Sequence, residues 1–266
     1  MINKTVVLTG ASGGMGKVSA LALLKDGYKV IGIDINDCDI KQENFKFIKA
    51  DLTNSLDRKN LIEQIHNENN QIYAIINLAG IFMMESIVEG ESEHLQKIID
   101  VNFFSSYYLN KGLFSLLDKD SRIINMSSEL ARYSPQPFMA YYAISKKMVD
   151  AYTDVLRREC NYIGIKVIKI QSGSMKTKML TKANNEYEQM VSKTKYFTSP
   201  LNKMKYMMDR ELKKNADPAI IANLIVKILN SKKPKIIYRV KNSFALKAMN
   251  MLPEKLQDNI YKKVIK

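Results

Sequence analysis

Tyr142 and Lys146 have residue types and a spacing that suit proton transfer. They stand four residues apart in a stretch with a helical pattern, and residues at i and i+4 share one face of a helix. A free phenol has a pKa of about 10, which is too high for a base near neutral pH. A neighbouring ammonium favours the phenolate and lowers that pKa. The pair therefore indicates general acid-base chemistry, with Tyr142 as the group that exchanges a proton.

The same Tyr-x-x-x-Lys spacing occurs three times in this lysine-rich chain, at Tyr107/Lys111, Tyr142/Lys146 and Tyr162/Lys166. Only the middle copy starts a helix soon after an apolar run, 122–126, that reads as a strand and ends in Ser127 and Ser128. Open α/β sheets place their ligands at the carboxyl ends of strands. The context of the middle copy therefore favours it as the reactive pair.

Asn102 is a polar residue in the otherwise apolar stripe of a long helical pattern, 93–117. A buried amide must find hydrogen-bond partners. Asn102 could simply bond the backbone, or it could hold a group of the site.

A glycine-rich turn near the start of the chain predicts what lies beside these side chains. The segment 9–16 reads Thr-Gly-Ala-Ser-Gly-Gly-Met-Gly, and it connects the strand-like run 5–8 to a helical pattern. Glycines allow a tight turn and a close approach of the backbone to a ligand. The free N–H groups of the new helix, together with its dipole, then form a site for a pyrophosphate. The turn predicts a dinucleotide site.

Two carboxylates at the ends of the next strands refine that prediction. Asp34 ends the apolar run 28–35, 18 residues after Gly16, where a carboxylate can accept both hydroxyls of an adenosine ribose and repel a 2′-phosphate. Asp34 therefore predicts NAD in preference to NADP. Asp51 follows the run 45–50 and could accept a bond from the adenine amine, while Leu52 packs on the ring.

Apolar runs and helical patterns alternate along the whole chain, which favours an α/β fold. Further strands are expected at 72–76, 165–170 and 235–240, and a helix that begins after Asp217-Pro218 runs to about Asn230. The segment 178–215 looks helical and rich in Met, Tyr and Lys, and it resembles an insertion that closes over a pocket. The tail from Asn242 predicts one basic amphipathic helix, or two that are broken at Pro253.

Composition limits the class of protein. No apolar run approaches the roughly 20 residues that cross a bilayer, and the amino terminus enters a strand at once, so we expect a cytoplasmic protein without a signal peptide. Two cysteines and two histidines without metal-ligand spacing predict no metal site. Of the net charge of +14, residues 1–175 contribute none and the last third contributes all. Such asymmetry suits an anionic membrane or substrate, or a plain solvated surface.

Taken together, these residues make the segment 4–240 resemble the short-chain dehydrogenase/reductase family. The matching cofactor motif is formed by Thr9, Gly10, Gly14 and Gly16, and the next two landmarks by Asp51-Leu52 and Asn77-x-Ala79-Gly80. The positions similar to the family's catalytic tetrad are Asn102, Ser128, Tyr142 and Lys146. The chain departs from the family pattern at Leu78, where asparagine is usual, and at Ser172-Gly173, where Pro-Gly is usual.

The resemblance implies a single doubly wound Rossmann domain, a mostly parallel seven-stranded sheet with helices on both faces, over residues 1–240. It includes the insertion at about 178–215, and residues 241–266 follow as a basic helical tail. The cofactor-binding residues implied are Gly10, Ser12, Gly14, Met15, Gly16, Asp34, Asp51, Leu52, Asn77, Ala79, Gly80, Tyr142, Lys146, Gly173 and Thr177.

The family also implies hydride transfer, without a metal, between NAD and an alcohol or ketone. Tyr142 would be the general acid/base, Ser128 (or failing that Ser127) would hold the substrate oxygen, and Asn102 would fix a water that relays protons through Lys146. We expect a hydrophobic secondary alcohol or ketone of the steroid, bile-acid, retinoid or acyl type. A carboxylated or conjugated ligand would also suit the basic insertion.

Resemblance further implies a homodimer or homotetramer. The alternative of another class is a peripheral membrane protein that docks on anionic lipid through residues 242–266. The apolar residues of that tail could equally pack on the body of the chain. Nucleic-acid binding is not expected, because no recognised binding module accompanies the charge.

Overall fold

The computed structural model describes residues 4–212 and 215–265, and its centre is one sheet of seven parallel strands. The spatial order is β3-β2-β1-β4-β5-β6-β7. The strands are β1 (Thr5–Thr9), β2 (Lys29–Asp34), β3 (Phe45–Lys49), β4 (Ala74–Asn77), β5 (Arg122–Ser128), β6 (Lys166–Ser172) and β7 (Ile237–Val240). The expected seven-stranded α/β fold is confirmed, and every strand pairing is parallel.

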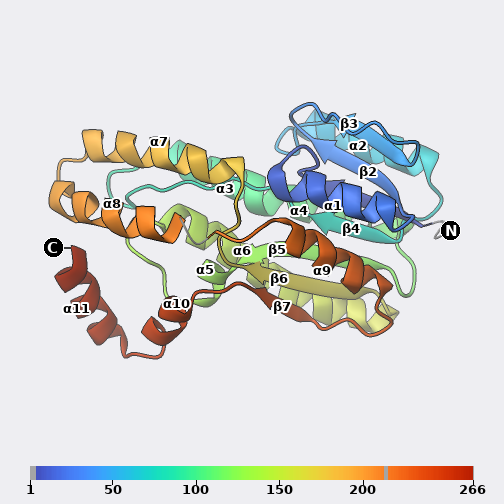
Figure 1. Cartoon of the computed structure of the whole chain (residues 1–266). Coiled ribbons are helices and arrows are strands. Elements are labelled where there is room, and N and C mark those ends of the chain that lie inside the picture. The colour runs from blue at the N-terminus through green and yellow to red at the C-terminus, as the bar shows by residue number, and fades with distance from the viewer. Residues whose placement is uncertain (1–3, 213–214, 266) are drawn as a thin grey trace.

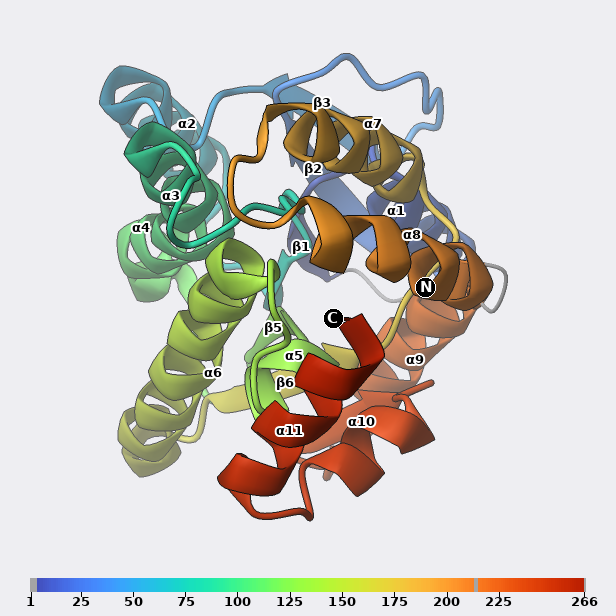
Figure 2. The same cartoon turned by 90° about the vertical axis from the view of Figure 1, so that its left-hand side faces the viewer.

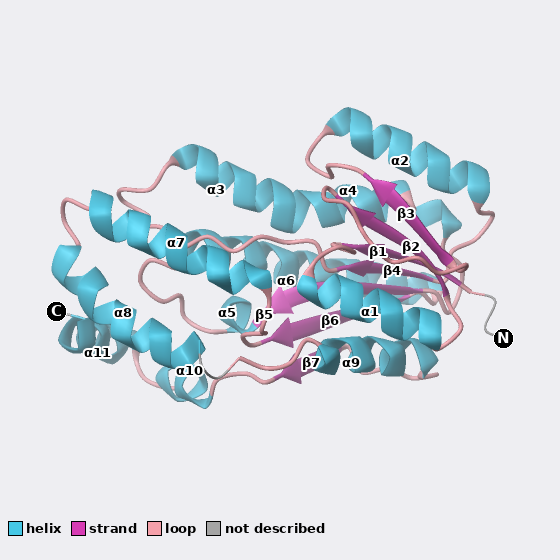
Figure 3. Cartoon of the chain, turned by 45° about the horizontal axis from the view of Figure 1, so that its top comes forward, coloured by secondary structure: helices cyan, strands magenta, loops and turns pink. Residues whose placement is uncertain are grey.

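Helices cover both faces of the sheet, as Figures 1 and 3 show. One face carries α1 (Gly14–Lys25) and α9 (Ala219–Asn230), whose apolar side chains pack with those of β1 and β4. The other face carries α2 (Ser55–Glu68), α4 (Ser105–Gly112) and α6 (Ala140–Cys160). The strands β4 and β5 are buried along their whole length, as strands covered on both faces must be.

The strand register brings the reactive residues to one edge. Ser128 at the end of β5 pairs with Ser172 of β6, and Thr9 at the end of β1 pairs with Asn77 of β4. In Figure 3 the strand arrows β5, β6 and β7 point toward the side on which α7 (Lys178–Lys193), α8 (Thr198–Leu212) and α11 (Glu254–Ile265) lie. β5 is two residues longer than the run 122–126 and includes both serines.

The helix expected over 93–117 is interrupted. It divides into α3 (Ser92–Ile99), a π-helical turn (Asp100–Phe104), α4 and a short 3₁₀ turn (Phe114–Leu116). The π turn holds Asn102 against the backbone of the β4–α3 loop, a contact 21 residues away in sequence. Single π turns of this kind occur frequently at functional sites.

The tail forms two helices, α10 (Phe244–Met249) and α11, with the break at Pro253 that the sequence allowed. Figure 2 shows α11 rising toward α8, and the two helices are in contact. The tail also touches the segment after β5, the short helix α5 (Glu129–Arg132) and its loop, because Asn250 accepts hydrogen bonds from Ser134. None of the described helices is long and apolar enough to cross a membrane.

Candidate active site

Tyr142 and Lys146 project from the first turns of α6 toward the carboxyl edge of the sheet. The Lys146 Nζ lies 5.7 Å from the centre of the Tyr142 ring and donates a hydrogen bond of 3.2 Å to the Met126 carbonyl of β5. Phe82 packs against the phenol, with 4.9 Å between ring centres. The β5 backbone therefore holds the Lys146 ammonium, and Phe82 holds the Tyr142 ring.

Burial controls the ionisation of this pair. Burial raises the pKa of Tyr142 to about 12, and a hydrogen bond from the Ser128 hydroxyl acts in the opposite direction. Burial lowers the pKa of Lys146 to about 8, and the nearby Asp150 carboxylate opposes this shift. The sequence predicted a lowered pKa for Tyr142, and the chain's own groups do not produce one. At neutral pH the phenol holds its proton and the ammonium is mostly charged.

The two serines at the end of β5 have different surroundings. The Ser128 hydroxyl contacts the phenol of Tyr142 and accepts a bond from the Leu130 N–H at the start of α5. The Ser127 Oγ is buried and makes no hydrogen bond. Ser128 is therefore the serine that contacts the Tyr142 phenol.

Asn102 is fully buried and binds the backbone. Its Oδ1 accepts from the Ile81 N–H at 2.7 Å, and its Nδ2 donates to the Ile81 carbonyl and to Ser145 Oγ. This arrangement holds the adjacent Gly80 so close that an added Cβ would lie 3.1 Å from Asn102 Oδ1 and 3.5 Å from Lys146 Nζ. Of the two roles that the sequence allowed, Asn102 therefore has the first, because its side chain binds the backbone. This contact brings the β4–α3 loop next to Lys146.

The backbone of the glycine turn is packed so closely that side chains larger than hydrogen would not fit at several positions. Gly10 has φ +73°, and a Cβ on Gly16 would stand 1.8 Å from the Gly10 carbonyl oxygen. A Cβ on Gly14 would meet the Thr177 side chain at 2.9 Å, so these two predicted cofactor residues are neighbours. No side chain caps α1, and its first turn contains no acidic residue. Ser12 and Met15 belong to the same turn and helix start, where N–H groups suit a pyrophosphate.

Asp34 lies beside this turn, because its Oδ2 accepts a hydrogen bond of 3.0 Å from the Ser12 N–H. Asp51 accepts bonds from the N–H and hydroxyl of Thr53 through one carboxylate oxygen, and Leu52 is buried. The three residues stand on the β2 and β3 side of the glycine turn, where the sequence placed the adenosine.

Two predicted cofactor residues have contacts inside the protein. Asn77 Nδ2 donates to Asn110 and Asn125 at 2.9 and 2.8 Å, so its side chain joins β4 to α4 and β5. The next residues, Leu78 and Ala79, donate their N–H groups to Thr9 Oγ1. A Cβ on Gly173 would stand 2.2 Å from the Lys241 carbonyl oxygen, so this glycine lets the chain cross after β7.

A cavity of about 730 Å³ opens beside the pair, between the β4–α3 loop and α7. Its apolar lining includes Ile81, Phe82, Met83, Met84 and Met190. Phe82 connects the cavity to the Tyr142 ring. Sequence reasoning missed Phe82, because nothing in its spacing distinguishes it.

The cavity is also lined by charged and polar side chains. The lining includes the carboxylates of Glu85, Glu89, Glu91 and Glu186, the ammonium groups of Lys97 and Lys193, and the imidazole of His94. The Glu89 carboxylate accepts hydrogen bonds from Thr194 Oγ1, Lys195 N–H and Tyr196 N–H, between α7 and α8. This contact attaches the predicted insertion to the β4–α3 loop.

Comparisons with known proteins agree with this geometry. Residues 4–188 match the family model of the short chain dehydrogenases. The chain is 28% identical to the 3-ketodihydrosphingosine reductase of Bacteroides thetaiotaomicron over 231 residues, 86% of this chain and 84% of that protein. It is 27% identical to a probable short-chain type dehydrogenase/reductase of Helicobacter pylori, over 97% of both chains.

Solved structures give the same result. The structure of a short chain dehydrogenase family protein from Francisella tularensis is similar with a TM-score of 0.75 at 27% identity, over 89% of this chain and 96% of that one. A 4-hydroxyisoleucine dehydrogenase complexed with NADH shares the fold with a TM-score of 0.71 at 21% identity, over 90% and 97%.

Proposed function

The chain belongs to the short-chain dehydrogenase/reductase family of oxidoreductases, and we propose that it transfers hydride between NAD and a hydrophobic secondary alcohol or the corresponding ketone. The observation that carries the proposal is the meeting of three side chains, Tyr142, Lys146 and Ser128, at the sheet edge that also holds the glycine turn. These groups can orient a carbonyl or carbinol oxygen and move a proton at it.

Tyr142 would donate its proton to the oxygen of the substrate in ketone reduction, the direction that a phenol protonated at neutral pH favours. Ser128 would donate a hydrogen bond to the same oxygen, where negative charge develops. The Lys146 ammonium would stabilise the phenolate that forms, and Asn102 would fix the loop beside it. When bound, the cofactor supplies the hydride or accepts it.

The residues present fit a dinucleotide. The glycine cradle that a Cβ would fill, at Gly10 and Gly16, leaves the N-terminus of α1 open to a diphosphate. The Asp34 carboxylate beside Ser12 would hold the adenosine ribose. The loop of Ala79 and Gly80, close to Lys146, would pass beside the nicotinamide end.

We propose NAD as the preferred cofactor because a 2′-phosphate would carry its negative charge next to Asp34. Asp34→Asn keeps an acceptor for the Ser12 N–H but removes the charge. The variant should shift the ratio of kcat/KM for NAD over NADP about 10- to 100-fold toward NADP. Steady-state kinetics with both cofactors measure this ratio. The matched control is Asp37→Asn, an exposed carboxylate of the same segment that pairs with Lys49, and an equal shift there would contradict the assignment.

The proposed substrate class rests on the cavity. Methionine side chains adapt to irregular apolar ligands, and the lining contains three of them beside Phe82. The names of two relatives, the 3-ketodihydrosphingosine reductase and an NADPH-dependent 1-acyldihydroxyacetone phosphate reductase of Schizosaccharomyces pombe, refer to ketone reduction. The four carboxylates among the described lining residues speak against a carboxylated ligand.

The proposed function is tested by following NADH and NADPH consumption with a panel of lipophilic ketones, and their production with the matching alcohols. Turnover of at least one apolar member, with a preference for NAD(H), supports the proposal. Turnover of small polar diketones alone would contradict the substrate class, and preference for carboxylated members would contradict the reading of the cavity.

One observation favours the membrane alternative for the tail. Phe244 and Met251 are 81% and 79% exposed, close to Lys247 and Lys255, whereas Ile265 and Gln257 are buried. Exposed apolar groups beside lysines suit an anionic bilayer. Wild-type protein should therefore co-sediment with vesicles of phosphatidylserine and phosphatidylcholine, and Phe244→Ser with Met251→Ser should abolish this. Equal sedimentation of both proteins would reject the alternative.

The family resemblance also implies a homodimer or homotetramer, which remains a proposal. Aromatic side chains gather along the π turn, α4 and the neighbouring face of α6, where the rings of Phe103, Tyr107 and Tyr152 contact one another and Tyr108 packs on Tyr107. Tyr108 is exposed in the single chain, and a subunit contact on this face would cover it.

A further inference from the structure

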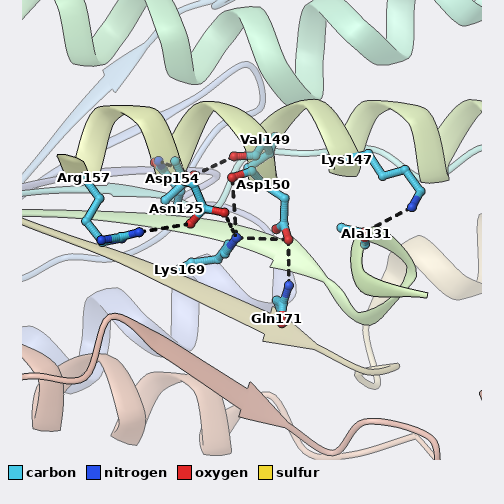
Figure 4. Close-up of polar contacts among 10 residues, drawn as sticks. Asn125, Ala131, Lys147, Val149, Asp150, Asp154, Arg157, Lys169 and Gln171 are labelled. Carbon is cyan, nitrogen blue, oxygen red and sulfur yellow. Dashed lines mark hydrogen bonds and ion pairs between the residues drawn. The ribbon is translucent and has the colours of Figure 1, made fainter. Parts of the chain in front are cut away.

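Behind the reactive pair, charged side chains are buried between α6 and β6. Lys169 stands in the middle of β6 with its side chain only 4% exposed, and its Nζ lies 3.1 Å from Asp150 Oδ2 and 3.0 Å from Asp154 Oδ2. Figure 4 shows this lysine between the two carboxylates of α6. A buried ammonium without ionic partners would destabilise the fold. The ion pairs of Lys169 with Asp150 and Asp154 therefore form one buried cluster.

The Asp150 carboxylate is fixed from the sheet side. Gln171, two residues after Lys169 on the same face of β6, donates its Nε2 hydrogen to Asp150 Oδ2 at 2.7 Å (Figure 4). The other oxygen, Oδ1, is buried and has no hydrogen-bond partner. One oxygen of Asp150 is therefore bound by β6, whereas the other makes no hydrogen bond and can interact electrostatically with charged groups along α6.

Two lysines of α6 precede Asp150 by about one turn: the exposed Lys147, whose ammonium donates to the Ala131 carbonyl, and the buried Lys146. Lys146 precedes Asp150 by four residues, so both side chains leave the same face of α6. At the far end, Asp154 is 3.8 Å from the Arg157 guanidinium. Because Lys169 of β6 lies between the two carboxylates of α6, the charges alternate in sign in the order Lys146, Asp150, Lys169, Asp154 and Arg157.

We propose that Asp150, held in place by Lys169 and Gln171, is a positioning residue that keeps the Lys146 ammonium charged beside Tyr142. This inference rests on the proposed function, in which that ammonium stabilises the phenolate. Asp150 of α6 and Lys169 of β6 neither line the substrate cavity nor lie at the glycine turn, so their role would be an indirect one.

The electrostatic surroundings of Lys146 leave Asp150 as its charged partner among the described residues. Burial lowers the pKa of Lys146 to about 8, and the Asp150 carboxylate is the group that raises it. From β5 the ammonium meets the Met126 carbonyl, and from its own helix the neutral Tyr142 phenol. Glu129, at the start of α5, acts on Tyr142. Without the Asp150 charge, the pKa of Lys146 must fall toward neutral pH.

Asp154 provides a matched control. It binds the same Lys169 through one oxygen at nearly the same distance and is also on α6. It stands eight residues after Lys146 and is paired with Arg157. A role limited to stabilising the buried lysine would make Asp150→Asn and Asp154→Asn equivalent, whereas the proposed role separates them.

The first measurement follows Lys146 directly, by ¹³C NMR titration of ε-labelled lysines in the protein without cofactor, with Lys146→Arg to assign the signal. The midpoint should lie near pH 8 in the wild type and at a distinctly lower pH in Asp150→Asn. Asp154→Asn should leave the midpoint nearly unchanged. Gln171→Leu should also lower the midpoint, because it removes the β6 donor that holds Asp150 without changing any charge.

The second measurement is the pH profile of alcohol oxidation. The alkaline limb of kcat should move to lower pH in Asp150→Asn and stay in place in Asp154→Asn, and Asp150→Glu should restore it. If Asp150→Asn does not fold, the downward shift in Gln171→Leu decides instead.

The inference is overturned if folded Asp150→Asn keeps the wild-type midpoint, if both aspartate variants shift it equally, or, where Asp150→Asn does not fold, if Gln171→Leu leaves the midpoint unchanged. Failure of the proposed function has a different signature. The Lys146 midpoint would then respond as described, while no alcohol or ketone is turned over by the wild type.

Discussion

Replacing Tyr142 with phenylalanine is expected to lower kcat about 10²- to 10⁴-fold, with little change in the affinity for NAD. The variant removes only the hydroxyl that contacts Ser128 and keeps the ring that packs against Phe82. The proton that hydride transfer requires then has no donor at the substrate oxygen. Steady-state kinetics and a fluorescence titration of cofactor binding measure the two quantities.

The adjacent residue offers a control. Tyr141 is buried on the same helix, and its hydroxyl donates to the Glu91 carbonyl rather than contacting Ser128. Tyr141→Phe should reduce stability slightly and leave kcat within about twofold. A Tyr142→Phe enzyme that turns over at the Tyr141→Phe rate would refute the role of the phenol.

Ser128→Ala is expected to lower kcat about 10²- to 10³-fold, the usual effect of removing one hydrogen-bond donor from a developing oxyanion. The hydroxyl stands at the end of β5, next to the Tyr142 phenol. Part of the loss will be structural, because the same oxygen accepts from the Leu130 N–H. Kinetics together with thermal unfolding separate the two contributions.

Ser127→Ala is the paired test, since the sequence alone could not separate the neighbouring serines except by preference. The Ser127 hydroxyl is buried without a hydrogen bond, so its loss should be nearly neutral for stability and should change kcat by less than about threefold. A larger loss for Ser127→Ala than for Ser128→Ala would transfer the role to Ser127.

The sheet could be predicted because its strands are determined locally. Runs of Val and Ile such as 5–8 and 72–76, each followed by Gly or Asn, indicate buried parallel strands whatever their partners are. The site followed from the same logic, since the ends of such strands must share one edge. Thus Asp34, Ser128 and the glycine turn could be placed before any contact was known.

Other features depend on contacts distant in sequence. The π turn at Asn102 exists because its amide binds Ile81, and no helical pattern encodes that partner. Lys169 sits in a strand expected to be apolar, and its charge is tolerated only because Asp150 and Asp154 face it from α6. Gly173 was assigned to the cofactor, yet its lack of a Cβ is required by the crossing chain at Lys241.

The pKa of Tyr142 shows a further limit of reasoning from residue types. A lysine at i+4 suggests a lowered pKa, but the phenol and the ammonium are both removed from water, and burial shifts each toward its neutral form. The pKa values of Tyr142 and Lys146 therefore depend on how deeply the two side chains are buried as much as on their spacing in the sequence.

The most direct test of the central claim is a deuterium-transfer measurement. Wild type and Tyr142→Phe are incubated with NAD and a lipophilic secondary alcohol such as 2-decanol, drawn from the panel that supports turnover and deuterated at the carbinol carbon. The account predicts that the wild type forms NADH one mass unit heavier than unlabelled NADH and that Tyr142→Phe forms almost none. Unlabelled NADH, or labelled NADH formed equally fast by both proteins, would contradict it.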